Sequence, residues 1–132
     1  MQSWLKPNGA EKVIDAKDIP RTLFDPSKII KGVGVDIESH REVKKEMARF
    51  FLTPKERAVS DLELLRLWTV KEALFKACPD NEKLLLTDFE TEDPQASSGK
   101  AYLRDNRTIE FQYSCHGTGA GYSSFAVCQE AA

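Results

Sequence analysis

The feature that most constrains the fold is a helical stretch with almost no polar face. Residues 64–75 read LLRLWTVKEALF, and apolar side chains such as Leu64, Trp68, Leu74 and Phe75 leave little of the helix circumference polar. A helix of this kind has to be covered on more than one side. The segments that flank it in the chain must therefore supply a packing surface.

The ends of this helix are marked in the sequence. Thr53 is a good cap, a proline follows at the first helical position, and Glu56 at the third position can reach back to the cap. Pro79 stops a helix that starts there. The pattern predicts helical structure over residues 54–78 and is compatible with a break near Ser60.

Strand-like segments lie on both sides of this helix. Residues 29–38, IIKGVGVDIE, are rich in β-branched residues and predict a buried strand. Residues 41–51 repeat apolar side chains at helical spacing and predict a second, basic helix. The later chain suggests strands at residues 84–92, 100–104, 107–115 and 122–130, with turns at residues 97–99, 105–106 and 117–121. We therefore predict an α+β fold in which a small antiparallel sheet packs against one long helix.

The composition predicts the class of protein. The chain has 132 residues, 41% hydrophobic and 30% charged, so we expect one domain over residues 29–132 after an irregular lead-in over residues 1–28. A net charge of −2 argues against a nucleic-acid binder. No run approaches the roughly 20 apolar residues of a membrane span, and a cytoplasmic location is expected. The three cysteines lack metal-type spacing and predict buried, reduced thiols.

Asp36 and Glu38 end the first predicted strand. They are two residues apart, so both carboxylates point to the same face of the sheet. Two like charges there are either solvated at the strand end or held together by a cation. Oxygen ligands without histidine or thiolate favour Mg²⁺, which leaves its other positions to water and phosphate.

Glu72 and Lys76 are one helical turn apart. By themselves they predict a surface ion pair that contributes about 0.3–0.5 kcal/mol. The apolar surroundings also allow Glu72 to face Asp36 and Glu38 as a third metal ligand. Lys76 would then hold an anionic ligand as a point charge.

Two motifs in this order carry a resemblance to a known family. The first, GVGVDIE at residues 32–38, is a strand ending in G-V-D-x-E, and the second, WTVKEALFKA at residues 68–77, contains K-E-A-x-x-K. Together they resemble the paired signature of the 4′-phosphopantetheinyl transferase superfamily. RFFLTPKE and GYSSFAVC are also similar to family segments, so the similarity extends over residues 29–128.

The resemblance implies a reaction and a set of site residues. The phosphopantetheine arm of coenzyme A would pass, with Mg²⁺, to a serine of an acyl or peptidyl carrier protein, and adenosine 3′,5′-bisphosphate would be released. This chemistry serves fatty-acid or polyketide biosynthesis. By position, Asp36, Glu38 and Glu72 match the metal ligands. Lys76 matches the lysine that contacts the phosphates of coenzyme A, and Lys71 is a second candidate for that contact.

Glu56 has two interpretations. It matches a glutamate regarded in the surfactin-type branch of the family as the base for the incoming serine, which would make it catalytic beside Glu72 and Lys76. A serine hydroxyl is a weak nucleophile and needs an acceptor for its proton. Glu56 is also the third residue of the Thr53 cap, and that purely structural role is the alternative.

The predicted basic helix could bind the carrier protein. Carrier proteins are acidic, and the compact branch of the family grips them with the helix after the first motif. The resemblance implies this role for Arg41, Lys44, Lys45 and Arg49. The alternative is a solvated helix face, balanced by the two glutamates of the same segment.

One departure from the family affects the assembly. The D-x-E form of the first motif is that of longer enzymes with two similar halves, and this chain has length for one half. The compact branch forms trimers, so we expect a homo-oligomer, with a trimer favoured, in which Asp36 and Glu72 meet across a subunit interface. The alternative function is a non-catalytic or fragmentary transferase-like domain that binds coenzyme A or a synthase partner.

Overall fold

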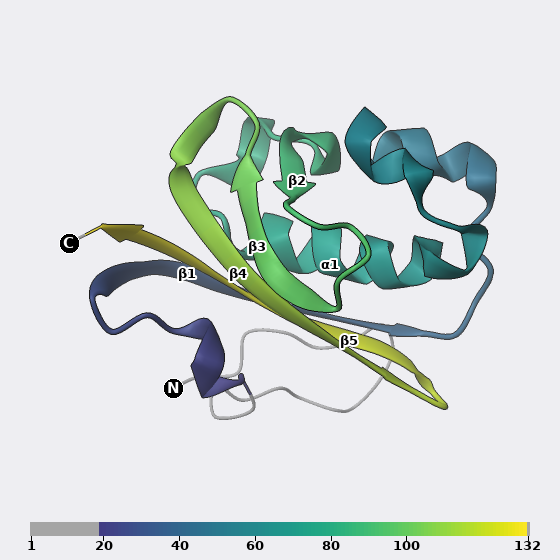
Figure 1. The fold of residues 1–132 in the computed structure, drawn as a ribbon, viewed down its shortest axis with the longest axis horizontal. Coiled ribbons are helices and arrows are strands. Elements are labelled where there is room, and N and C mark those ends of the chain that lie inside the picture. Colours follow the sequence, from purple (N-terminus) through teal and green to yellow (C-terminus); the bar gives the residue numbers. More distant parts are fainter. Residues whose placement is uncertain (1–18, 132) are drawn as a thin grey trace.

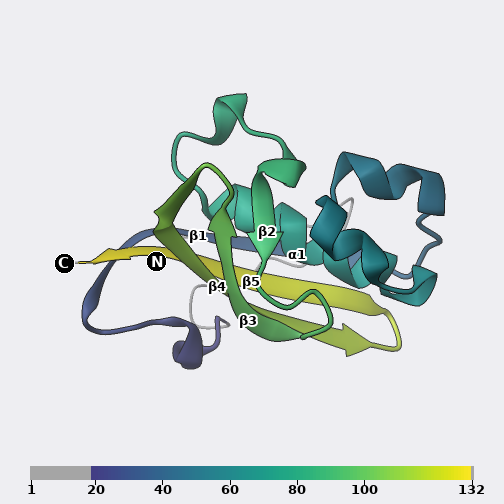
Figure 2. The same cartoon turned by 45° about the horizontal axis from the view of Figure 1, so that its top comes forward.

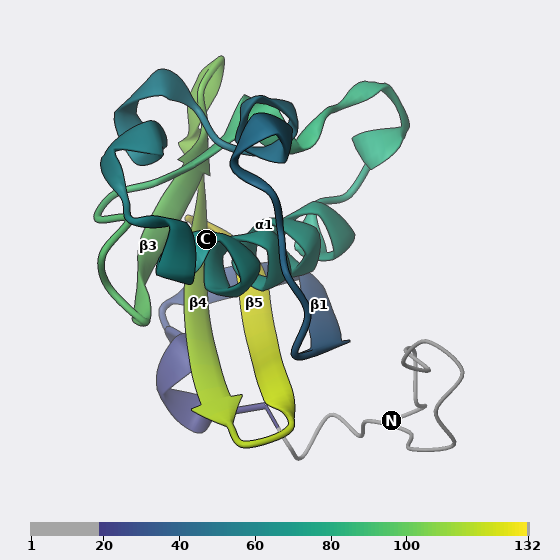
Figure 3. The same cartoon turned by 90° about the vertical axis from the view of Figure 1, so that its right-hand side faces the viewer.

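One sheet and one α-helix form the framework of the computed structural model, which describes residues 19–131. The strands are β1 (Lys28–Ser39), β2 (Phe89–Thr91), β3 (Ser98–Leu103), β4 (Asn106–Thr118) and β5 (Gly121–Ala131). They form an antiparallel sheet in the order β1-β5-β4-β3-β2. Helix α1 (Leu64–Ala77) lies across one face of this sheet (Figures 1 and 3). The predicted α+β architecture, a small antiparallel sheet against a long helix, is confirmed.

Short 3₁₀ segments make up most of the remaining helical structure in the described residues. They are η2 (Arg21–Leu23), η3 (Lys45–Phe50), η4 (Pro54–Ala58), η5 (Asp61–Glu63), η6 (Asn81–Lys83) and η7 (Leu86–Asp88). Figure 2 shows η3, η4 and η5 gathered beside α1. The predicted helical region therefore consists of η4, η5 and α1, and the break near Ser60 is confirmed.

The predicted basic helix over residues 41–51 is wrong in extent. The chain is irregular after β1, and only the 3₁₀ segment η3 forms, over Lys45–Phe50. The physical reason lies in the packing that follows. Phe51 and Leu52 are adjacent and both fully buried in a cluster with Leu64 of α1. The backbone N–H groups of Phe51 and Leu52 both donate to the oxygen of Ala48, at 3.1 and 2.7 Å, so the turn closes there and the segment does not continue as an α-helix.

Two strand boundaries also differ from the prediction. Residues 84–92 form only the short strand β2, because η7 precedes it and Asp88 accepts a hydrogen bond from the backbone N–H of Leu85 at 2.7 Å. The turn expected at residues 97–99 falls earlier, where Asp93 accepts from the backbone N–H of Gln95 at 2.9 Å. Tertiary pairing with β4 extends β3 back through residue 98.

The sheet is covered on both faces. Helix α1 packs on one face through Val70, Leu74 and their neighbours against aromatic residues such as Phe111. The other face is covered by Ile19 and Leu23, which belong to the predicted lead-in. Residues 1–18 of that lead-in lie outside the described residues. Cys78, Cys115 and Cys128 are all buried and free, as predicted.

None of the helices within residues 19–131 is both long enough and apolar enough to cross a membrane.

Two glycines let α1 lie directly on β1. A Cβ atom on Gly32 would stand 2.1 Å from the backbone oxygen of Ala77, and one on Gly34 would stand 2.2 Å from that of Ala73. Both glycines face α1 because they alternate with Val33 and other residues that pack on the opposite face. A strand glycine at such a position permits close approach of another backbone. The GVGVD motif therefore sets the distance between strand and helix.

We expect Gly34→Ala to lower the free energy of unfolding by about 1–3 kcal/mol, because the added methyl group would push α1 away from β1. Urea denaturation followed by circular dichroism measures this change. Gly99→Ala is the matched control, since its Cβ would meet Tyr113 Oη at an ordinary 3.7 Å. Equal stability of the two variants would contradict the close-approach explanation.

Candidate active site

Asp36 and Lys76 form the ion pair at the centre of the candidate site. Lys76 Nζ donates to Asp36 Oδ1 at 2.9 Å and lies 3.3 Å from the backbone oxygen of Val35. The contact follows from the glycines above, because close packing of α1 on β1 brings the last turn of the helix beside the end of the strand. Lys76 was expected to pair with Glu72 or with a ligand. Among the described residues it pairs with Asp36 instead.

The Asp36 carboxylate is buried and incompletely satisfied. Burial raises the pKa of Asp36 to about 7, although Lys76 opposes this shift. The charges of Glu38 and Glu72 raise it further. Asp36 Oδ2 is buried and has no hydrogen-bond partner among the described residues. An ionised carboxylate in this position needs more positive charge than one lysine provides.

Glu72 and Glu38 complete the acidic cluster. Burial raises the pKa of Glu72, Lys76 opposes the shift, and Glu38 adds to it. Glu38 is held by Arg41, whose Nη2 lies 3.5 Å from its Oε1. The three acids therefore come close enough to affect one another within a single chain. The expectation that Asp36 and Glu72 meet across a subunit interface is wrong, because β1 and α1 of the same chain pack together.

The three carboxylates of the acidic cluster have some, but not all, of the features of a divalent-cation site. Within residues 19–131, no three His, Cys, Asp or Glu side chains already stand in an arrangement that could hold a metal ion. Mg²⁺ usually needs only one or two carboxylates and takes water and phosphate as its other ligands. The unsatisfied Asp36 Oδ2 and the repulsion among the three acids fit such an ion. Asp36, Glu38 and Glu72 are the residues that could bind it.

Glu56 and Lys71 form a second ion pair, but it lies in the interior. Lys71 Nζ donates to Glu56 Oε1 at 2.6 Å and also to the backbone oxygen of Phe89. Glu56 Oε1 accepts from the backbone N–H of Thr53 at 2.9 Å, so the predicted reach of Glu56 back to the cap residue is confirmed, whereas Thr53 Oγ1 has no hydrogen-bond partner among the described residues. Its Oε2 accepts from the backbone N–H and hydroxyl of Thr91, at 2.8 and 2.7 Å. Both side chains are fully buried.

This geometry separates Glu56 and Lys71 from the acidic cluster. Every oxygen of Glu56 is occupied by protein donors, and the ammonium of Lys71 does not reach the surface. Burial lowers the pKa of Lys71, and the charge of Glu56 opposes that shift. The structure thus gives the pair a structural role. Lys71 was expected to contact coenzyme A, and Glu56 was expected to act as a base. Each role needs a side chain that a ligand can reach, and both side chains are fully buried.

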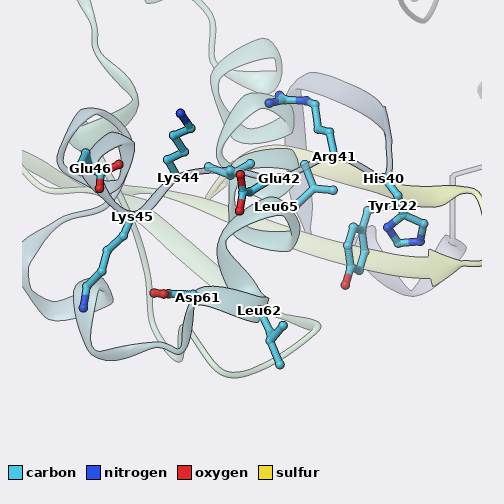
Figure 4. A pocket seen from close by; sticks show the side chains of 11 residues that line it. His40, Arg41, Glu42, Lys44, Lys45, Glu46, Asp61, Leu62, Leu65 and Tyr122 are labelled. Atoms are coloured by element: carbon cyan, nitrogen blue, oxygen red, sulfur yellow. The ribbon is translucent and has the colours of Figure 1, made fainter.

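The predicted carrier-binding residues do not share one helix face. Arg41 lies over the ring of Trp68, 5.8 Å from its centroid, and Arg49 lies over Phe50. Lys44 and Lys45 point in different directions in Figure 4. Three of the four predicted residues line a cleft of about 860 Å³: Arg41, Lys44 and Lys45. The cleft is also lined by His40, Glu42, Glu46 and Asp61. We call this the charged cleft.

Two features of the site were not recognised in the sequence. The first is the role of Gly32 and Gly34, although two glycines spaced by two in a strand could have signalled close approach of another backbone. The second is the contact of Arg41 with both Glu38 and Trp68. No pattern along the chain indicates this contact, because it depends on the irregular backbone after β1.

Comparison with known proteins identifies related sequences and folds. The family described as the 4′-phosphopantetheinyl transferase superfamily matches residues 32–128. The crystal structure of Thermotoga maritima holo-[acyl-carrier-protein] synthase is similar, with a TM-score of 0.61 and 18% sequence identity. The match covers 79% of this chain and 66% of that synthase, and at this identity it shows a shared fold. None of the curated proteins matches the sequence.

We expect Asp36→Asn to stabilise the protein near neutral pH. The native pKa of Asp36, about 7, is above its ordinary value of 3.8, so the native state of the wild type loses stability as pH rises between these two values. Asparagine cannot ionise. In EDTA, urea denaturation should show the variant more stable by about 1–4 kcal/mol at pH 8, with the difference vanishing toward pH 4. A difference that does not change with pH would contradict this account.

Proposed function

This chain belongs to the 4′-phosphopantetheinyl transferase superfamily, and we propose that it transfers the 4′-phosphopantetheine arm of coenzyme A to a serine of an acidic acyl or peptidyl carrier protein. The observation that carries the proposal is the cluster of Asp36, Glu38 and Glu72 between β1 and α1, with Lys76 at its edge. These are the acids and the lysine of the two sequence motifs. Adenosine 3′,5′-bisphosphate would be the second product.

The proposed reaction is a substitution at phosphorus. The serine oxygen of the carrier forms a bond to the phosphorus that bears the pantetheine arm. The bond from this phosphorus to the bridging oxygen of the diphosphate breaks, and the nucleotide leaves with its 5′-phosphate. The serine proton would pass to a carboxylate oxygen of the acidic cluster. Glu56 is too enclosed to accept it.

The site residues would act on the donor diphosphate by charge. When bound, Mg²⁺ would neutralise the diphosphate and the charge that develops on the leaving phosphate. Asp36, Glu38 and Glu72 would hold the ion. Lys76 has 33% of its side chain exposed, so its ammonium can contact a donor phosphate as a point charge.

We place the carrier protein on the charged cleft. Lys44 and Lys45 line it, and Leu62 in its wall is 88% exposed and available as an apolar anchor. An acidic carrier would be steered by the lysines, whose charges act mainly on the association rate and its salt dependence. Glu42 and Glu46 lie in the same wall and would limit this attraction.

We also propose a homo-oligomer, with a trimer favoured, in the cytoplasm. Ile29 and Ile30 are half exposed on β1, an edge strand whose outer side pairs with no other strand in the described part of the chain. Exposed apolar side chains on a strand edge favour contact with another chain. The three free, buried cysteines support a reducing compartment.

Modification of a carrier protein tests the proposed activity directly. We expect the protein, incubated with coenzyme A, Mg²⁺ and a panel of apo carriers, to add the phosphopantetheine mass to at least one of them. Glu72→Ala and Lys76→Ala should each lower the rate at least about 100-fold, because they remove charges that act on the diphosphate. Mass spectrometry measures both results.

The control for these variants is Glu82→Ala, which removes an exposed glutamate of η6 and should leave the rate unchanged. If no carrier is modified although coenzyme A binds, the non-catalytic alternative replaces the transferase proposal. Full activity of Glu72→Ala would show that the acidic cluster is not the active site.

The assembly is tested by light scattering on the purified protein. We expect the mass of an oligomer, and we expect Ile30→Lys to shift it toward the monomer because a charge on the strand edge opposes pairing. Lys31→Glu, at the neighbouring position of the same strand, is a control for the effect of charge alone. A wild-type monomer that binds coenzyme A would refute the oligomer.

A further inference from the structure

Ser124 of β5 lies directly opposite Asp36 on the neighbouring strand. Directly opposed residues of an antiparallel pair send their side chains to the same face of the sheet, with Cβ atoms about 4.5–5.5 Å apart. Ser124 therefore faces α1, as Asp36 does. The next residues of β5 on that face, Ala126 and Cys128, belong to the core cluster that α1 covers, which agrees with this direction. Ser124 is outside both sequence motifs, and it borders the acidic cluster.

The hydroxyl of Ser124 is buried and unsatisfied. Ser124 is 0% exposed. Within residues 19–131, four buried side-chain nitrogen or oxygen atoms lack a hydrogen-bond partner, and two of them, Ser124 Oγ and Asp36 Oδ2, belong to this one opposed pair. A hydroxyl can donate one hydrogen bond, whereas an oxygen of an ionised carboxylate only accepts. The two unsatisfied groups are thus complementary, and one bond between them would satisfy both.

Lys76 sets the present orientation of the Asp36 carboxylate. Its ammonium donates to Asp36 Oδ1 at 2.9 Å. Under the proposed function Lys76 contacts a donor phosphate instead, so Asp36 loses this partner when the donor binds. A carboxylate that binds a metal ion is normally held by a further hydrogen bond from the protein. Ser124 offers a buried, unused donor at the opposed strand position.

Cys115 is the competing partner for the Ser124 hydroxyl. It lies opposite Ser124 on the other neighbouring strand, β4. Burial raises the pKa of the Cys115 thiol, and the Ser124 hydroxyl opposes that shift. A protonated thiol is only a weak acceptor, whereas a hydrogen bond to an ionised carboxylate is among the stronger ones in proteins. The Ser124 hydroxyl therefore gains more by donating to Asp36 than to Cys115.

We propose that Ser124 is a positioning residue for Asp36: its hydroxyl donates to Asp36 Oδ2 and holds the carboxylate in the orientation that binds the metal ion. This inference rests on the proposed function, because it concerns a residue that acts through a proposed metal ligand. Ser124 itself contacts neither the donor nor the carrier serine. Loss of such a partner typically lowers metal affinity about 10- to 100-fold.

Two measurements on the full chain test this role. Isothermal titration calorimetry measures the Mg²⁺ affinity with coenzyme A present at saturation, after subtraction of a titration of Mg²⁺ into coenzyme A alone. We expect Ser124→Ala to weaken Mg²⁺ binding about tenfold. Urea denaturation in EDTA should show the variant to be as stable as the wild type or more stable, because the hydroxyl that it removes is buried and unsatisfied.

Ser123→Ala is the matched control. Ser123 precedes Ser124 in β5 and lies opposite Ile37, whose side chain packs on the other face of the sheet. This variant should keep the Mg²⁺ affinity of the wild type. Cys115→Ala removes the competing partner and should keep that affinity as well. A loss in Cys115→Ala equal to the loss in Ser124→Ala would show that the hydroxyl acts through β4, and it would overturn the proposal.

The outcomes separate this inference from the transferase proposal. Unchanged Mg²⁺ affinity in Ser124→Ala overturns the positioning role, and modification of a carrier by the same variant leaves the transferase proposal intact. Unchanged affinity together with lower stability in EDTA would identify the hydroxyl as structural. If the wild type binds no Mg²⁺, the positioning role fails, and carrier modification by the wild type decides separately whether the transferase proposal fails with it.

Discussion

The close contact between α1 and β1 is the constraint on which the candidate site depends. Gly32 and Gly34 leave no side chain between the two backbones, so the helix lies against the strand along its last turns. This contact places Lys76 at hydrogen-bonding distance from Asp36 and turns Glu72 toward the same region. A longer separation would leave the two motifs on opposite sides of a layer of side chains.

The same contact explains why the site is electrostatically costly. Asp36 is buried near two other carboxylates, and one lysine compensates only part of the charge. Proteins tolerate an uncompensated buried charge where a ligand supplies the missing opposite charge, and the ligand-free protein is less stable as a result. The unsatisfied oxygen of Asp36 is thus more consistent with a binding site than with a scaffold.

The Glu56–Lys71 pair shows the opposite arrangement. Its charges are buried too, but every Glu56 oxygen is bonded, and the pair joins η4 and α1 to both ends of β2. Loss of one partner in such a pair costs about 3–5 kcal/mol, because the other charge stays buried. The lysines of the two pairs come from the same helix, and Lys71 and Lys76 both belong to the second motif. Glu56 is fully hydrogen-bonded and Asp36 is not, which supports a structural role for Lys71 and the proposed ligand contact for Lys76.

The sequence by itself determined the α+β architecture, the family, and the shared strand face of Asp36 and Glu38, because each depends on local periodicity or on motif spacing. It also determined the bond between Glu56 and the backbone of Thr53 and the break near Ser60. Only the tertiary structure decided that Lys76 pairs with Asp36, that Lys71 is enclosed, and that residues 41–44 are not helical. These outcomes depend on which side chains meet across the packed elements and on how deeply they are buried. Neither the contacts between elements nor the depth of burial can be derived from the residue order within one segment.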